Sequence, residues 1–440
     1  MNWRIVVLAV LLTIVIVWQV PHTIVFRYTL IVGLGMFTWP LAGERLAHPA
    51  SSAERWARLP FAVLAAFLLW SVVVAVLVSP SASASLKDLR AEWLAPTLIL
   101  LLGFGSALRF PERDGVVRVI FLGCVLHAFM SLVTAALMII HGDHIDLRNF
   151  GGIGDHKANV TYTNTIALAM LIADAAARTR GAEGFLRIDT RWSLAAFTLL
   201  LASTILATTR NGLVVFALMC VLGFLLVAGE FRVGTSRKAW LTLFACGLVT
   251  LAGTLGGLKA EPRWSNFFAT APVAWDTHGN TQWLQGERVE TGLPMTSVGK
   301  PVEPSAYFRI AYLREGLEIL REHPWGTRVG RDAFRLAVVD KFGRGGMSHA
   351  HNGFIDLGVS LGFPGLALWI AFLASFVMYV VRVPEAAGSG LRGALLLVII
   401  GFAARTMLDA TVRDHIIQEH LLAMGALLGS IALAGTANRA

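Results

Sequence analysis

The chain has 440 residues, of which 56% are hydrophobic and only 15% are charged. Soluble domains carry about 25% charged residues, so a water-soluble protein of this composition would leave too much apolar surface in water. The composition excludes a soluble enzyme, a disordered chain and a secreted disulfide scaffold, and predicts a polytopic membrane protein. The net charge of +9 does not indicate nucleic-acid binding, because the basic residues lie in short clusters between apolar runs.

These apolar runs predict an all-α fold with about twelve membrane-spanning helices, since about 20 mostly apolar residues cross the hydrocarbon core. The first run follows Arg4 and resembles a signal peptide, but no small-residue cleavage site follows it, so it is predicted to remain as a helix. The eleventh run ends beside Arg405 and Asp409, and we expect Asp409 to be neutralised by Arg405 and Arg413. The predicted spans are residues 4–20, 24–43, 60–79, 93–108, 116–140, 160–177, 193–209, 212–229, 239–258, 353–381, 392–408 and 416–434.

The connections between the predicted spans differ in their content of Lys and Arg. The connection between the sixth and seventh spans holds Arg178, Arg180, Arg187 and Arg191, whereas the next one holds Arg210 alone. Loops rich in Lys and Arg face the cytoplasm. Applied to the whole chain, this rule predicts that both termini are cytoplasmic and that the connections after odd-numbered spans face outward.

One connection, residues 259–352, is far longer than the others and is predicted to lie on the outer side. It divides the chain into helices one to nine (1–258), the large loop (259–352) and helices ten to twelve (353–440). The first half of the large loop is rich in Pro and Gly and is expected to be irregular, while helical spacing predicts a helix over 307–322, ended by Pro324. A connection of this length usually carries function.

Several polar residues of the predicted outer face could take part in chemistry. Arg210 has apolar runs on both sides, so it either reaches the lipid headgroups or binds phosphate through its planar guanidinium, and Arg309 opens the loop helix. His351 could act as a general base, whereas Asn352 could cap the following helix. His349 and His351 form an H-x-H pair, but no third ligand lies at a convincing spacing, so no metal site is predicted.

Some motifs are missing, and their absence narrows the function. The sequence has no Asp-x-Asp clamp for a metal–diphosphate complex, no Walker A motif and no paired acidic residues deep in successive spans. The cysteines have neither disulfide nor zinc-ligand spacing and are expected to be core residues: Cys124, Cys220 and Cys246. The sequence therefore predicts no metal and no cofactor.

At His351 the sequence becomes specific. His351-Asn352 is followed by nine residues and then by Gly362, two further residues and Gly365, a pattern that resembles the signature of the O-antigen ligase and polymerase superfamily. The Arg-x-x-x-Leu element of that family is similar to Arg309–Leu313, and its Ser/Thr-Arg element to Thr209-Arg210. The three elements occur in the family's order, and the predicted spans and large loop also resemble the family.

Members of this superfamily transfer a glycan from undecaprenyl diphosphate to an acceptor at the periplasmic face of the bacterial inner membrane. The resemblance therefore implies a multi-pass glycosyltransferase whose partners are membrane lipid, the lipid-linked donor and an acceptor. The close match of the His-Asn signature, and an end soon after the last span, favour an O-antigen ligase that uses lipid A–core oligosaccharide. Alternatives are an O-antigen polymerase, a protein O-oligosaccharyltransferase or, outside the enzymes, a transporter of lipid-linked glycans, although no internal repeat is visible.

The resemblance also implies roles for the motif residues. Neutral His351 would accept the proton of the acceptor hydroxyl, and Arg210 and Arg309 would neutralise the diphosphate leaving group without a metal. Direct displacement would invert the anomeric configuration. Arg288 and His349 are possible further contacts.

Three other motif residues are expected to support the site. Asn352 would orient the neighbouring histidine or cap the helix. Gly362 and Gly365 would let helices approach closely, and with Pro364 they would kink the tenth span.

Overall fold

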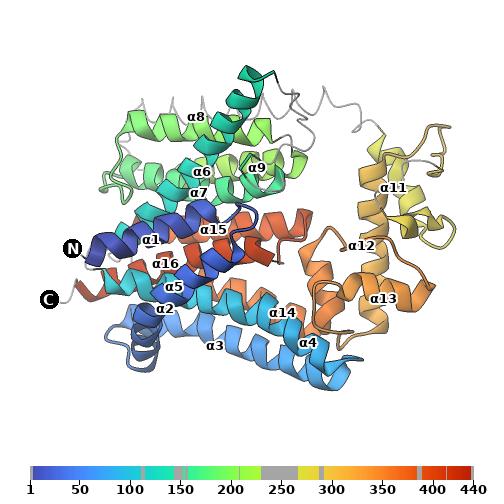
Figure 1. Ribbon diagram of the computed structural model, residues 1–440, viewed down its shortest axis with the longest axis horizontal. Coiled ribbons are helices and arrows are strands. Elements are labelled where there is room, and N and C mark those ends of the chain that lie inside the picture. The colour runs from blue at the N-terminus through green and yellow to red at the C-terminus, as the bar shows by residue number, and fades with distance from the viewer. Residues whose placement is uncertain are drawn as a thin grey trace.

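A computed structural model describes most of the chain, and its regular elements are helices (Figure 1). Within these residues the only β-type pairing is an isolated bridge between Met295 and Pro301. The predicted all-α fold is therefore confirmed. The described residues are 3–110, 114–142, 152–153, 157–207, 209–228, 266–286, 292–383, 389–412 and 414–437.

Most of the helices lie side by side in one bundle, and the start of α1 and the end of α16 lie at the same end of it (Figure 1). Two π-helical segments occur in the bundle: η1 (Val74–Val78) extends α3, and η2 (Arg90–Leu94) joins α4 to α5. The bundle helices are α1 (Trp3–Val17), α2 (Ile24–Ala47), α3 (Ser52–Val73), α4 (Ala82–Leu89), α5 (Ala95–Arg109), α6 (Gly115–Ile140), α7 (Lys157–Thr179), α8 (Thr190–Leu206), α9 (Arg210–Ala228), α14 (Gly353–Arg382), α15 (Ser389–Leu408) and α16 (Asp414–Ala437).

Eight helical segments of the described chain are long and apolar enough to cross a membrane. Three shorter apolar helices, α1, α8 and α9, coincide with three other predicted spans, and the predicted span 239–258 lies outside the described residues. The structure thus supports a multi-pass membrane protein, while the count of twelve stays a prediction. The eight segments are Ile24–Ala47, Ser52–Val78, Ala82–Arg109, Gly115–Ile140, Ala158–Thr179, Gly353–Arg382, Gly390–Leu408 and Ile416–Gly435.

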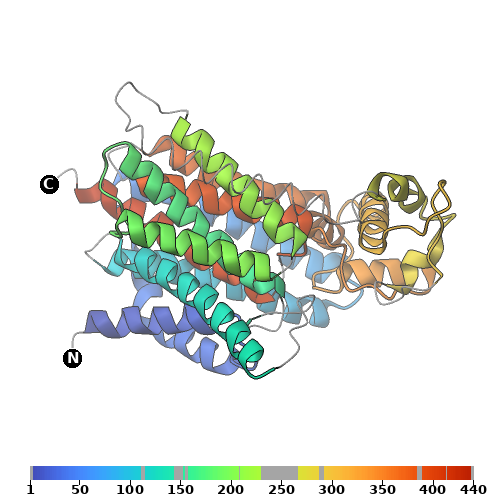
Figure 2. The same ribbon diagram turned by 90° about the horizontal axis from the view of Figure 1, so that it is seen from above.

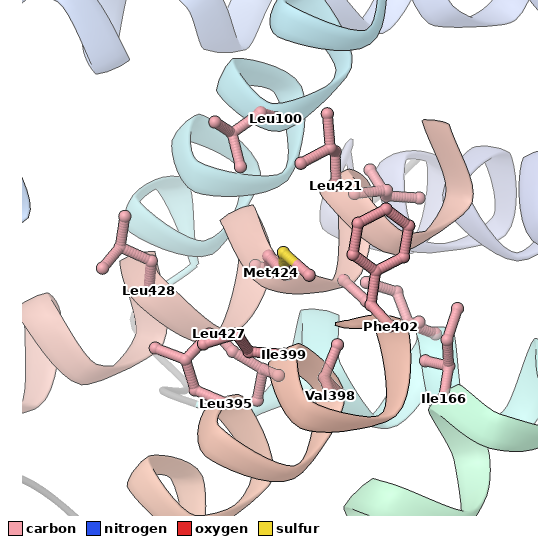
Figure 3. Close-up of a cluster of buried hydrophobic side chains, with 14 of the residues drawn as sticks. Leu100, Ile166, Leu395, Val398, Ile399, Phe402, Leu421, Met424, Leu427 and Leu428 are labelled. Atoms are coloured by element: carbon pink, nitrogen blue, oxygen red, sulfur yellow. The ribbon is translucent and has the colours of Figure 1, made fainter. Parts of the chain in front are cut away.

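The centre of the bundle is held by close packing of α16 against α5. Gly425 and Gly429 of α16 form a Gly-x-x-x-Gly pair, and a Cβ atom at either position would overlap a carbonyl oxygen of α5, that of Leu100 or Phe104. Small residues allow this approach, and dispersion between closely packed backbones stabilises helix pairs in lipid. Figure 3 shows the neighbouring core, to which α5, α7, α15 and α16 contribute Leu100, Ile166, Phe402 and Met424 among others.

The large loop folds into a small helical unit at one end of the bundle, which we call the loop unit (described residues 266–286 and 292–352; Figure 2). It contains α11 (Phe267–Trp275), the 3₁₀ helix η4 (Thr281–Gln285), α12 (Pro304–Glu322) and α13 (Ala333–Phe342). The helix expected over 307–322 is present as α12, which stands across the end of the bundle (Figure 1). The core of the loop unit is aromatic and extends onto α14, through Trp283, Tyr307, Phe308, Tyr312, Phe334, Ile355 and Val359.

Helix α14 breaks at Gly362, where φ is +70° and ψ is −175°. The turn that follows α12 inserts there, since the backbone amide of Phe363 donates to the Pro324 carbonyl at 2.9 Å and that of Thr327 donates to the Val359 carbonyl at 3.1 Å. The kink expected at Gly362 is therefore present, and it serves to join the loop unit to the bundle. One turn later, a Cβ atom at Gly365 would lie 3.2 Å from the indole of Trp70 in α3, which matches the expected close packing.

The substitution Gly362→Ala is expected to destabilise the protein by about 1–3 kcal/mol, the usual cost of a non-glycine residue held in a sparsely populated backbone region. The added methyl group would also overlap the Pro324 carbonyl oxygen. Gly393→Ala is the matched control, because its Cβ would meet only the Ala173 methyl group, at 3.5 Å. Thermal unfolding of the two variants in detergent, monitored by size-exclusion chromatography, measures their stability. Equal unfolding midpoints would show that the break in α14 does not require glycine at position 362.

Candidate active site

Residues that are far apart in the sequence meet where α12 crosses the end of the bundle. The segment before α14 carries His351 and Asn352, α15 ends at Leu408, and α9 begins with Arg210. The backbone amide of Gly353 donates to the Asp409 carbonyl at 3.1 Å, which joins the start of α14 to the end of α15. The three sequence elements that resemble the superfamily motifs thus come together in one site.

Asn352 is the N-cap of α14. Its Oδ1 accepts hydrogen bonds from the amides of Phe354 and Ile355, both at 3.1 Å, and its Nδ2 donates to the Met407 carbonyl at 3.1 Å. Of the two roles expected for Asn352, the structure supports capping. The cap leaves His351 with φ +53°, an uncommon conformation for this residue type that typically costs about 1–3 kcal/mol and tends to occur at functional sites.

The imidazole of His351 is held between an aromatic ring and a carboxylate. It stacks on Tyr312 with an interplanar angle of 10° and a centroid distance of 6.2 Å, and its Nδ1 lies 3.6 Å from Oδ1 of Asp409. The ring of His349 packs edge-on against that of His351, with the ring centroids 4.0 Å apart, and its Nδ1 accepts a hydrogen bond from the His351 backbone amide. The His351 side chain is 17% exposed, so one edge can still reach a substrate.

The position of Asp409 adds a partner to those predicted for it. The charge of Arg405 acts on Asp409, as the sequence suggested, while Arg413 lies outside the described residues; the carboxylate also faces His351. Oδ2 of Asp409 also accepts a hydrogen bond from the hydroxyl of Tyr162 at 2.9 Å. Sequence reasoning therefore missed two site residues, Asp409 and Tyr162. The signal for Tyr162 was present, since α7 is polar at this end and apolar further on.

Asp409 is held in its charged form. Burial raises the pKa of its carboxyl, but contact with His351, the charge of Arg309 and the Tyr162 hydrogen bond outweigh burial, so the pKa lies well below the usual range. A carboxylate beside one ring nitrogen of a histidine selects the tautomer that carries its proton there, and it stabilises the imidazolium ion. The pair is therefore suited to general-base chemistry at the other ring nitrogen.

Arg309 and Asn211, the neighbour of Arg210, both reach the end of α15. Arg309 donates through Nη1 to the Leu408 carbonyl at 3.2 Å, and Asn211, next to Arg210, donates to the same oxygen at 2.8 Å. Arg210 itself lies 3.3 Å from Oε1 of Glu303, the N-cap of α12, and is 33% exposed. Arg210 thus has a protein partner instead of reaching headgroups alone, and it retains exposed surface for a ligand.

Arg288, a possible further contact, lies outside the described residues. One set of side chains in the described part of the chain has the spacing of a metal site: His278, Glu315 and Glu318 in the loop unit. The ammonium of Lys341 lies 2.8 Å and 3.0 Å from these two carboxylates and takes the place of a cation. Burial lowers the pKa of Lys341, but its carboxylate partners raise the pKa by more than burial lowers it, so the ammonium stays charged. We therefore assign no metal to this set.

Residues 195–370 match the family model described as O-antigen ligase. The matched region contains Thr209-Arg210, Arg309–Leu313 and the signature from His351 to Gly365. No curated protein matches the chain in sequence. The match over these residues supports the resemblance to the O-antigen ligase superfamily that the motifs indicated.

Proposed function

We propose that the protein is an O-antigen ligase of the bacterial inner membrane, which transfers O-antigen polysaccharide from undecaprenyl diphosphate to lipid A–core oligosaccharide. The observation that carries the proposal is the site itself, with a carboxylate-supported histidine beside two arginines. The family match supports the chemistry. The Lys and Arg distribution supports cytoplasmic termini and a site that faces the periplasm, and the start of α1 and the end of α16 lie at the end of the bundle opposite the loop unit (Figure 1).

In the proposed reaction, the bond between the anomeric carbon and the diphosphate oxygen breaks, and its electron pair leaves with the diphosphate. Arg210 and Arg309 neutralise the growing negative charge. A hydrogen-bond donor aimed at such charge in a site that excludes water stabilises the transition state by about 2.7–4 kcal/mol. Because guanidinium groups can do this, the reaction needs neither a metal nor protonation of the leaving group.

The acceptor hydroxyl oxygen attacks the anomeric carbon, and its proton passes to Nε2 of His351, the ring nitrogen that does not face Asp409. Positioned general bases of this kind accelerate reactions about 10²–10⁴-fold. Asp409 stabilises the resulting imidazolium ion. Attack from the face opposite the diphosphate inverts the anomeric configuration, so NMR of the product linkage tests the displacement.

A polymerase or a protein O-oligosaccharyltransferase would use the same site with a different acceptor. Deletion in the native host separates them. Lipopolysaccharide without O-antigen, with polymer retained on undecaprenyl diphosphate, identifies a ligase; a single repeat unit on the core identifies a polymerase; loss of protein glycosylation alone identifies an oligosaccharyltransferase. A transporter is excluded by transfer in detergent with purified components, since transport requires a sealed vesicle.

A further inference from the structure

Arg405 lies in the last turn of α15 and is fully buried, although it takes no part in the reaction described above. Its guanidinium lies over the ring of Tyr162, 4.1 Å from the centroid, and its Nη2 donates to the hydroxyl of Thr161. A charged side chain inside a membrane bundle is costly and is usually kept for a function.

The two α7 residues that Arg405 contacts, Tyr162 and Thr161, are hydrogen-bonded to different parts of the site. The Tyr162 hydroxyl donates to Oδ2 of Asp409, the carboxylate beside His351. Thr161 accepts a hydrogen bond at 3.5 Å from Thr209, which directly precedes Arg210. One buried guanidinium therefore supports both the histidine side and the arginine side of the site.

We propose that Tyr162 and Arg405 are positioning residues for glycan transfer, which hold the Asp409 carboxylate against His351 and share its negative charge. The inference rests on the proposed function. Arg405 fixes the Tyr162 ring by a cation–π contact, which is worth most in a desolvated place. The ring in turn aims its hydroxyl at the carboxylate, and a hydrogen bond to a charged group is among the stronger ones.

If Tyr162 and Arg405 share the charge of Asp409, removing either should change the pH at which His351 loses its proton in a definite direction, whereas loss of packing alone predicts no direction. Without the Tyr162 hydroxyl, the Asp409 carboxylate acts more strongly on the imidazolium ion, so His351 keeps its proton to a higher pH. Without Arg405 the change has the same sign, because a positive charge near the pair is lost. Within the described residues, the titratable and charged groups that contact the pair or act on it are His349, Arg309, Tyr312, Tyr162 and Arg405, and Asp356 accepts the amide of Ala350 beside His351.

The variant Tyr162→Phe tests this directly, because it keeps the ring under Arg405 and removes only the hydroxyl. We expect the acid limb of the pH profile of kcat/KM to move upward by about 0.5–1 pH unit, less than the one to three units that a full neighbouring charge produces. Activity on the acid limb should fall by up to about tenfold, because one pH unit is a tenfold change in neutral imidazole, and it should recover as the pH rises. KM should change little.

Carbethoxylation of His351 by diethylpyrocarbonate, followed by mass spectrometry over a pH series, reports the same ionisation without any substrate. Tyr379→Phe is the matched control: this tyrosine is also buried in the bundle, but its hydroxyl faces the Leu428 carbonyl at 3.4 Å, and it should behave as wild type. Arg405→Gln should shift the carbethoxylation curve in the same direction as Tyr162→Phe.

A loss of activity that is equal at all pH values, or a downward shift of the carbethoxylation curve, would overturn the positioning role. The proposed function fails separately. If wild-type protein transfers no glycan while Tyr162→Phe still moves the carbethoxylation curve upward, Tyr162 still positions the Asp409–His351 pair, and only the assignment to glycan transfer fails.

Discussion

The substitution His351→Gln is expected to reduce glycan transfer about 10²–10⁴-fold, the usual contribution of a general base. Glutamine keeps hydrogen-bonding capacity at this position, where φ is +53°, but it has no ring nitrogen that can accept a proton near neutral pH. Transfer by purified protein from lipid-linked donor to lipid A–core measures it. Size-exclusion chromatography in detergent confirms that the variant is folded.

His323→Gln is the matched control, because this histidine is exposed at the C-cap of α12 and lies outside the site. It should transfer glycan as the wild type does. Wild-type transfer by His351→Gln would exclude the base role and leave the histidine as a packing residue against Tyr312.

Replacing Arg210 with lysine should raise the activation free energy by about 2.7–4 kcal/mol, which lowers kcat/KM about 100- to 1,000-fold. Arg210 faces Glu303, and the guanidinium has enough donors to keep this partner while it binds two diphosphate oxygens. A lysine ammonium is a point charge without that geometry, so it should remain with Glu303 and lose the diphosphate.

Arg314→Lys offers a matched comparison, since Arg314 also pairs with a glutamate of α12, Glu318 at 2.7 Å, but lies in the loop unit away from the site. Its kcat/KM should equal that of the wild type. If Arg210→Lys also retained near-normal turnover, Arg210 would be a residue that anchors α9 at the lipid boundary, and Arg309 alone would have to neutralise the diphosphate.

The helical class and the motifs of the candidate site could be recognised in the sequence because their signals are local. Apolar runs predict bundle helices wherever they occur, and the His-Asn signature and the two Arg elements are short segments whose spacing is visible in one dimension. The bounds of the spans were less predictable: α8 (Thr190–Leu206) begins and ends three residues before the predicted span 193–209.

The partners of these residues were not predictable. Asp409 is 58 positions from His351 and adjoins Arg405 along the helix, so the sequence suggested Arg405 as its partner but not His351. Only the crossing of α7, α15 and the segment before α14 brings Tyr162, Asp409 and His351 into contact. Likewise, Gly362 could be predicted as a kink, but not as the point where the turn after α12 enters the bundle.

By itself, the sequence determined that this chain is a helical membrane protein, and it predicted that three motifs carry its chemistry, because hydrophobicity and motif spacing are properties of short segments. The tertiary structure decided which polar groups face one another. Inside a bundle, a charge must find its partner among side chains from other helices, and the pairing depends on how remote helices pack rather than on any run of residues.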